Sequence, residues 1–223
     1  MFIGHFAVGM IGSRVEPRLR LGTAFVAAQL PDVLWPCFLL AGIEHATIVP
    51  GDTVVTPLRF DSYPWSHSLL MVALWGTALG LRLRWRGGGT RAGVVAACLA
   101  LSHWLLDFAT HRADMPILPW GGPRLGLGLW RSLPLTMLVE GVLFALGVAC
   151  YVRGRRLSLG FWALVATLVV LYVANLFGPP PPNMTAVAGS AIVLFPLIWL
   201  WANFSAARSS PHTPRATSAG SAR

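Results

Sequence analysis

Long apolar segments separated by short arginine clusters constrain the fold of this chain more than any other feature. A membrane-spanning helix needs about 20 mostly apolar residues. The candidate spans are residues 20–43, 64–83, 91–110, 133–152, 160–177 and 186–204, preceded by a shorter apolar segment at 2–13. Only 11% of the 223 residues are charged, against about 25% in a typical soluble domain. We therefore predict an all-α polytopic membrane helix bundle over residues 1–205 and a disordered cytoplasmic tail at 206–223.

The first long segment contains a predicted break. Its "QLPDVLWP" stretch carries Pro31 and Pro36, and proline interrupts the hydrogen-bond ladder of a helix. The segment is therefore expected to form two half-helices or one kinked helix, with Asp32 at the break.

The arginine clusters predict the orientation of the bundle. All 17 basic residues are arginine and the formal net charge is +9, which in a soluble protein would suggest nucleic-acid binding. Here the arginines lie between apolar segments at 14–20, 82–91 and 153–156, and again at 208. Positive loops usually face the cytoplasm. We therefore expect a multi-pass protein of the bacterial inner membrane with a cytoplasmic C-terminus, the lipid bilayer as partner, and no nucleic-acid partner.

Ionisable side chains inside the apolar segments gather near the opposite, extracytoplasmic ends. They are His5, Asp32, His67, His103, Asp107 and Glu140. Each costs roughly 2.5–3.5 kcal/mol to place in a membrane span, so such residues are functional candidates. None of them falls near an expected cytoplasmic end, and this predicts that they meet around one site.

One helical segment supplies the clearest pattern of metal ligands. His103, Asp107 and His111 are spaced four residues apart, so they can lie on one face of a helix. Imidazole nitrogen and carboxylate oxygen suit zinc, and also manganese or iron. An open shell of histidines and carboxylates, completed by water, is typical of a catalytic metal site.

Simpler interpretations of the same residues stay open. Asp107 could pair with Arg112, and His103 with Glu140, as buried polar pairs that fix helix register. An interhelical hydrogen bond would explain Glu140 equally well, and His111 could be a loop residue at the membrane surface.

Four motifs resemble the bacterial family of YdjM-type membrane-bound metal-dependent hydrolases. They are "GHFAVG" at 4–9, "QLPDVLWP" at 29–36, "YPWSHSLL" at 63–70 and "SHWLLDFATHR" at 102–112. The resemblance implies metal binding at His5, Asp32, His67, His103 and Asp107.

A more distant similarity is to the all-helical zinc-dependent phospholipases C. Those enzymes use a further His-x3-Glu helix, whereas Thr136 stands where a histidine would precede Glu140. The similarity therefore implies one or two ions rather than three.

The leading functional hypothesis is a metal-dependent hydrolase of a phosphoester or lipid-like substrate at the outer face of the membrane. A metal-bound water would attack the ester, with Asp32 or Glu140 as general base, and Arg112, Arg124 or Arg131 would hold a phosphate. A metal or proton carrier and a non-catalytic membrane adaptor are the alternatives.

Overall fold

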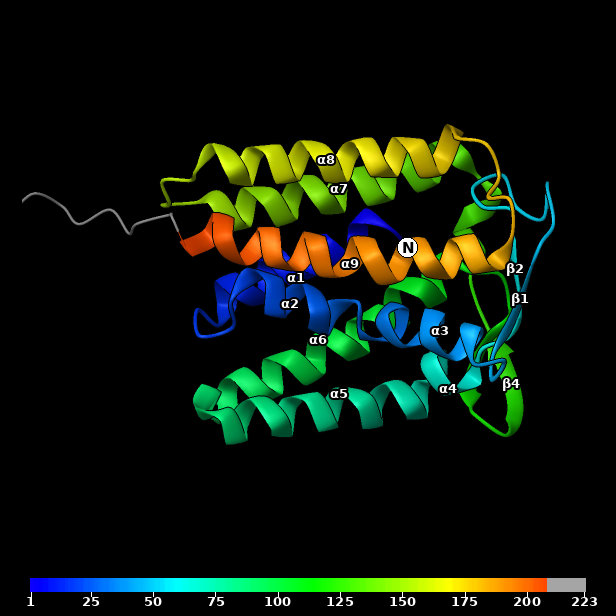
Figure 1. The fold of residues 1–223 in the computed structure, drawn as a ribbon, viewed down its shortest axis with the longest axis horizontal. Helices are drawn as coiled ribbons and strands as arrows, with labels where there is room; N and C mark the ends of the chain where they lie inside the picture. The colour runs from blue at the N-terminus through cyan, green and yellow to red at the C-terminus, as the bar shows by residue number, and fades with distance from the viewer. Residues whose placement is uncertain (208–223) are drawn as a thin grey trace, which may run out of the picture.

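The protein, described by a computed structural model over residues 1–207, is a helix bundle capped at one end by two short β-hairpins (Figure 1). The helices are α1 (Ile3–Val15), α2 (Leu21–Ala28), α3 (Leu30–Leu40), α4 (Pro64–His67), α5 (Leu69–Leu83), α6 (Gly89–Thr110), α7 (Leu133–Val152), α8 (Leu159–Phe177) and α9 (Met184–Ala207). Short turns of helix, η1 (Arg84–Gly88) and η2 (Leu129–Arg131), join some of them. Most of the predicted tail, residues 208–223, lies outside the described part of the chain.

The two ends of the bundle differ in chemistry. One end, the strand end, carries the hairpins; the other, the arginine end, carries the α1–α2, α5–α6 and α7–α8 connections (Figure 1). Ten of the fourteen arginines among residues 1–207 lie at or next to those three connections: Arg14, Arg18, Arg20, Arg82, Arg84, Arg86, Arg91, Arg153, Arg155 and Arg156. The four at the strand end are Arg59, Arg112, Arg124 and Arg131.

The prediction of six full spans is not confirmed. Four helical stretches are long and apolar enough to cross a membrane, namely Leu69–Thr110, Leu133–Val152, Leu159–Phe177 and Met184–Ser205, and the bent pair of α2 and α3 would make a fifth. The stretch Leu69–Thr110 turns back on itself at Gly87 and Gly89, which have positive φ. Its first arm, α5, has 15 residues and is about 22 Å long, less than the hydrocarbon thickness of about 30 Å.

The predicted break in the first long segment is confirmed. Helices α2 and α3 meet at an angle of 59°, and the break lies at Gln29, just before Pro31. Because Pro31 has no backbone N–H, it is tolerated in the first turn of α3 but cannot continue α2. Asp32 is consequently placed in the first turn of α3, where its half-buried side chain lines a cavity.

The β-hairpins correct the all-α prediction: the chain is mostly helical with two small sheets. Strands β1 (His45–Ile48) and β2 (Leu58–Ser62) pair antiparallel, as do β3 (Met115–Leu118) and β4 (Gly121–Leu125). The sequence does not signal them, because strands of four or five residues carry little period-2 pattern, and β4 begins with the strand-disfavouring "GGP".

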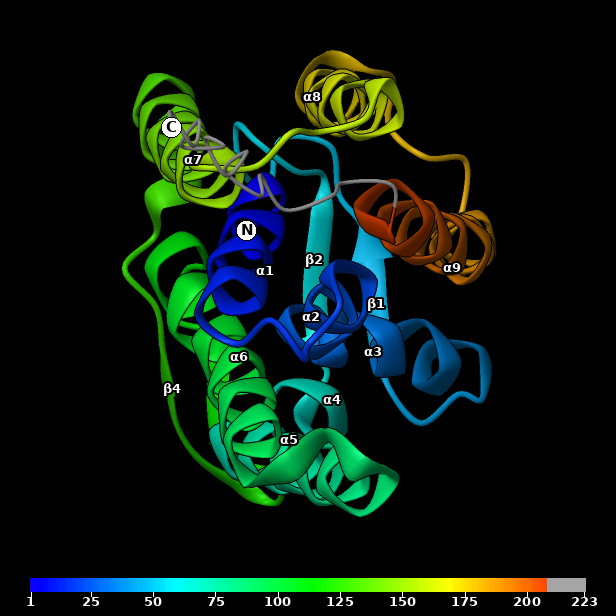
Figure 2. The ribbon, with the colours of Figure 1, turned by 90° about the vertical axis from the view of Figure 1, so that its left-hand side faces the viewer.

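Small residues allow the central helices to approach closely. Helix α1 lies between α6 and α7 near the middle of the bundle (Figure 2). A Cβ atom added to Gly147 of α7 would lie 2.8 Å from the Cβ of Ala7 on α1, so the two backbones are almost in contact. This packing, typical of membrane helices, fixes α1 with its first turn facing α6.

Candidate metal centre

Four helices bring five of the predicted ligands together. His5 comes from the first turn of α1, Asp32 from the first turn of α3, and His67 from the end of α4. His103 and Asp107 lie one turn apart on α6. All are buried except Asp32, whose side chain is 30% exposed.

The ligand atoms form two overlapping groups with spacings suited to a metal ion. His5, His103 and Asp107 form one group and Asp32, His67 and His103 the other, each with its ligand atoms within 4.8 Å of one another. Nε2 of His103 lies 3.0 Å from Oδ2 of Asp107, and Nε2 of His67 lies 3.4 Å from Oδ1 of Asp32. Ligand atoms bound at about 2.1 Å to a tetrahedral ion lie roughly 3.4 Å apart. The geometry therefore fits one ion, or two that share His103.

The hydrogen bonding of His103 leaves a buried lone pair that calls for a cation. Its Nδ1 lies 2.9 Å from the carbonyl oxygen of Ala28, and since a carbonyl only accepts, Nδ1 carries the proton. In the neutral ring Nε2 is then an unprotonated acceptor, and it has no hydrogen-bond partner among the described residues. It faces a carboxylate oxygen of Asp107 at 3.0 Å. A proton or a metal ion is needed between two such acceptors.

His67 is oriented by a chain of hydrogen bonds that starts in the loop before β1. Glu44 accepts hydrogen bonds from the backbone N–H groups of Trp65 and Ser66 at 2.7 and 2.8 Å, and from the Ser66 hydroxyl at 2.6 Å. Because that hydroxyl donates to Glu44, its oxygen is free to accept from Nδ1 of His67, 2.7 Å away. The proton of His67 is thereby held on Nδ1, and the lone pair of Nε2 faces Asp32 and Asp107.

Sequence analysis missed Glu44 and Ser66 as members of the site. Ser66 has a partial signal, because a serine directly before a predicted ligand at a helix start is placed to bond that ligand. Glu44 has none: it lies 22 residues before Ser66, and only the fold of the β1–β2 hairpin brings the two together.

Glu140 and the start of α1 form the floor of the site. Oε2 of Glu140 accepts hydrogen bonds from the backbone N–H groups of Phe2 at 2.8 Å and Gly4 at 3.4 Å. The amine of Met1 pairs with Asp107. Glu140 belongs to neither ligand group, and its contacts are those of a cap on α1. Its predicted catalytic role stays a prediction.

His111 lies at the strand end in a separate polar network and belongs to neither ligand group. Its Nδ1 is 3.1 Å from Oδ1 of Asp114 and 3.3 Å from the hydroxyl of Tyr63. Arg112 donates to Asp114 at 3.1 Å and to Asp52 at 2.8 Å. Burial works against ionisation of Asp114, but the hydrogen bonds from His111 and Tyr63 and the charge of Arg112 outweigh it and lower the pKa of Asp114. The network ties the two hairpins to the end of α6.

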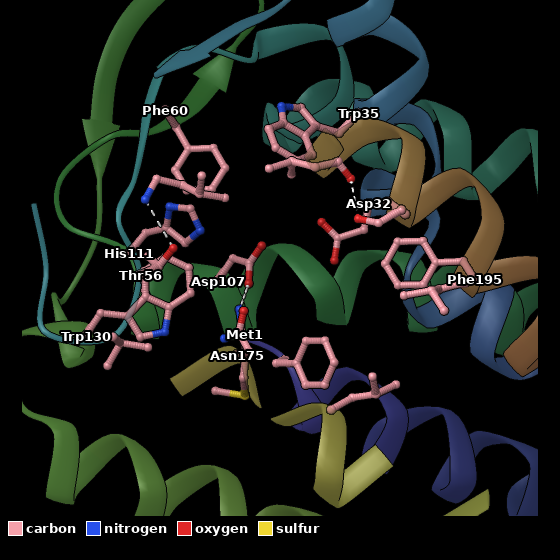
Figure 3. A pocket seen from close by; sticks show the side chains of 18 of the residues that line it. Met1, Asp32, Trp35, Thr56, Phe60, Asp107, His111, Trp130, Asn175 and Phe195 are labelled. Carbon is pink, nitrogen blue, oxygen red and sulfur yellow. Dashed lines mark hydrogen bonds and ion pairs between the residues drawn. The ribbon is translucent and has the colours of Figure 1, made fainter. Parts of the chain in front are cut away.

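A cavity of 380 Å³ opens directly onto the candidate centre. Figure 3 shows Asp32, Asp107 and His111 around it, with Phe195 of α9 on another wall. The predicted substrate-binding residues Arg112, Arg124 and Arg131 are not among its lining residues. The side chains of Arg124 on β4 and Arg131 in η2 are exposed. Arg131 directly follows Trp130, which lines the cavity.

Comparison with known proteins agrees with the motifs. The profile of the YdjM inner membrane protein family matches residues 1–179, a range that contains every residue of the candidate centre. No curated protein and no solved structure matches the chain, so the distant similarity to zinc-dependent phospholipases C is not shown. Because the family profile covers well over half of the sequence, the chain belongs to the YdjM inner membrane protein family.

Proposed function

We propose that this protein is a metal-dependent hydrolase that cleaves a phosphoester of a lipid-like substrate near the extracytoplasmic face of the inner membrane. The observation that carries the proposal is the buried, unpartnered Nε2 of His103 facing the carboxylate of Asp107. A proton on Nε2 of His103 would satisfy that contact alone. Three imidazoles and two carboxylates that converge within metal-ligand spacing are satisfied more fully by a divalent cation.

The residues of the centre divide naturally into binding and reacting groups. His5, His67 and His103 would bind through Nε2, and Asp107 offers one oxygen to the side of His5 and the other to the side of His103. When bound, zinc, manganese or iron would supply a Lewis acid and an activated water. Asp32 is the only ligand candidate with a substantially exposed side chain, and it lines the cavity. Asp32 is therefore better placed than Glu140 to take a proton from water beside a substrate.

The orientation follows from the arginine distribution. Ten described arginines at the arginine end against four at the strand end favour a cytoplasmic arginine end. Helix α9 ends there, and the candidate centre lies toward the other end, where α6 gives way to β3 (Figure 1). Among the predicted arginines, Arg131 is the best placed to reach a phosphate, since Arg112 is already paired with Asp52 and Asp114.

We favour the hydrolase over a carrier. A transport path needs polar groups on both sides of a binding site. Toward the arginine end, however, the interface of α1, α2 and α6 is an apolar cluster that includes Ala24, Ala27, Ala96 and Leu99. A proteoliposome flux assay with zinc or protons should accordingly show no transport above that of empty liposomes.

Metal analysis of the detergent-purified protein tests the proposal. We expect about one or two equivalents of a divalent metal in the wild type, and a loss of at least 90% in His103→Ala and Asp107→Ala with membrane insertion retained. His45→Ala, which changes an exposed histidine of β1, is the matched control and should keep its metal. Full metal content in both variants, or a metal-free wild type, would refute the assigned site.

A further inference from the structure

Two adjoining cavities, rather than one, surround the candidate centre. The 380 Å³ cavity at the centre and a second cavity of 620 Å³ share the lining residues Val55, Thr56, Leu58, Asn175, Val187 and Ser190. The second cavity, here called the vestibule, lies between the loop that joins β1 to β2 and the "PPPP" turn that joins α8 to α9. Both connections are at the strand end, so the vestibule leads from the centre to the surface there.

The lining of the cavity at the centre extends to the side of the bundle formed by α8 and α9. Leu171 and Asn175 of α8, one turn apart, face Ser190 and Leu194 of α9, also one turn apart, and all four line the cavity. Leu194 is at the same time 41% exposed. In Figure 2, α8 and α9 form one edge of the bundle. A residue that both lines the cavity and faces outward from a membrane helix marks a lateral opening, here called the slot, into the apolar part of the bilayer.

Three environments therefore meet at one point. The slot is apolar at Leu171 and Leu194, and Phe195 and Ile198 continue this wall inward. Its polar side chains, Asn175 and Ser190, lie where the slot joins the vestibule. The centre carries the imidazoles and carboxylates. The vestibule is lined mainly by prolines and aliphatic residues, but it adds the hydroxyls of Thr53 and Thr56 at the strand end. A molecule that fills all three is apolar at one end, binds a cation in its middle, and carries hydrogen-bonding groups at the end nearest the surface.

We propose that the substrate is an amphiphile in which a phosphoester joins a hydrocarbon chain to a polar headgroup. The chain occupies the slot, the phosphoester lies at the centre, and the headgroup extends into the vestibule. The assignment rests on the proposed function, because it takes the scissile group to be the one at the metal ligands. A volume of 380 Å³ is at the small end of ligand pockets, so only the part of the chain next to the ester lies inside and the rest stays in the bilayer.

The charge of the cavities makes this binding depend on metal. Asp32, Asp107 and Glu140 line the inner cavity, where the amine of Met1 pairs with Asp107. Among the described residues no lysine or arginine lines either cavity. An anionic phosphate is repelled by such a wall unless a bound cation offsets it. The substrate is thus expected to bind only to metal-loaded protein.

Photolabelling provides a readout that does not depend on turnover. The probe is a single-chain lysophosphatidylglycerol with a diazirine near the ester end of its chain, added to wild-type protein in nanodiscs. With zinc present, we expect labelled peptides to come mainly from the segments around Leu171 and Leu194, and removal of zinc by a chelator should lower that labelling at least fivefold.

Two leucines of α9 give a matched pair of variants. Leu194→Trp should fill the slot and reduce labelling at least fivefold. Leu197→Trp makes the same change at a position that is 57% exposed and does not line the cavity, so it should label like the wild type. Metal content is measured for both and should be unchanged.

The possible failures are distinguishable. Equal labelling of the two variants, or labelling spread evenly over the lipid-facing helices, overturns the slot even when the protein holds its metal, and leaves the proposed function standing. Slot labelling that is indifferent to zinc, in a protein that retains none, overturns both the metal centre and the placing of a phosphoester there.

Discussion

Replacing Glu44 by glutamine should reverse the hydrogen bonds that orient His67. In the wild type the Ser66 hydroxyl donates to Glu44 and accepts from Nδ1 of His67. If the amide oxygen of the introduced glutamine keeps the two backbone N–H donors, its NH₂ group must face Ser66 Oγ, which then accepts instead of donating. The hydroxyl now donates to Nδ1, and the imidazole proton moves to Nε2, the atom that faces Asp32 at 3.4 Å. A protonated Nε2 cannot bind a metal ion.

The expected loss of metal affinity depends on how many of the candidate ligands the substitution disturbs. Glu44→Gln acts on His67 alone, while His103, Asp107 and His5 keep their own contacts. Loss of a residue that orients a ligand typically costs 10–100-fold in metal affinity, which corresponds to about 1.4–2.8 kcal/mol. Ser66→Ala removes the partner of Nδ1 without reversing the ring, so its loss should lie near the tenfold end of this range.

Zinc affinity is measured by competition with a chromogenic chelator in detergent, and thermal unfolding is recorded on the same samples. Glu16→Gln is the matched control. Glu16 is 5% exposed and Glu44 is 1% exposed, and each accepts a backbone N–H, but Glu16 pairs with Arg91 at the arginine end. Wild-type affinity in a folded Glu44→Gln protein, or an equal loss in Glu16→Gln, would show that the chain of hydrogen bonds does not govern the centre.

Two further predictions concern stability. Gly80→Ala should destabilise the α5–α6 pair by about 1–3 kcal/mol, because the new Cβ would lie 2.5 Å from the carbonyl oxygen of Gly93. Gly141→Ala, which has open space around it, should not destabilise the protein. Thermal unfolding in detergent compares the two variants. The lowered pKa of Asp114 means that its ionised form favours the folded state, so its contribution is full above the ordinary aspartate pKa of about 4 and is lost as the pH falls through the folded-state value. Asp114→Asn should accordingly lower the unfolding temperature at pH 7 and show a smaller further drop at pH 3; an unchanged acid dependence would contradict this.

The sequence contains enough information to predict which ionisable side chains come together, because these residues obey local rules. His103 and Asp107 share a helix face by their spacing, and Pro31 requires a helix break next to Asp32. The apolar surroundings make each ionisable residue conspicuous. The sequence predicts convergence of His5, Asp32 and His67 on that face from spans that alternate in direction. In the structure the helix breaks at Gln29 and Ser68 also place Asp32 and His67 there.

Local sequence patterns do not predict the parts of the fold that depend on contacts between residues far apart in the sequence. The two hairpins are set by contacts between the strands and the helix ends they cover, such as Tyr63 with Asp114 and Arg112 with Asp52. The six-span count was not confirmed for a related reason. Segment length alone does not reveal that α4 stops at Ser68, whose backbone is extended, or that α5 is too short to cross the membrane by itself.

The interruptions of the helices explain how a membrane bundle can hold so many buried carboxylates. Asp32 lies in the first turn of α3, Glu140 accepts the N–H groups at the start of α1, and Glu44 accepts those at the start of α4. Each start would otherwise leave unsatisfied N–H groups, with a partial positive charge, inside the bundle. Carboxylate and helix start therefore stabilise one another. An unbroken span would have ended in a loop, far from the centre, so the break at Gln29 is what allows Asp32 to sit at the depth of the imidazoles.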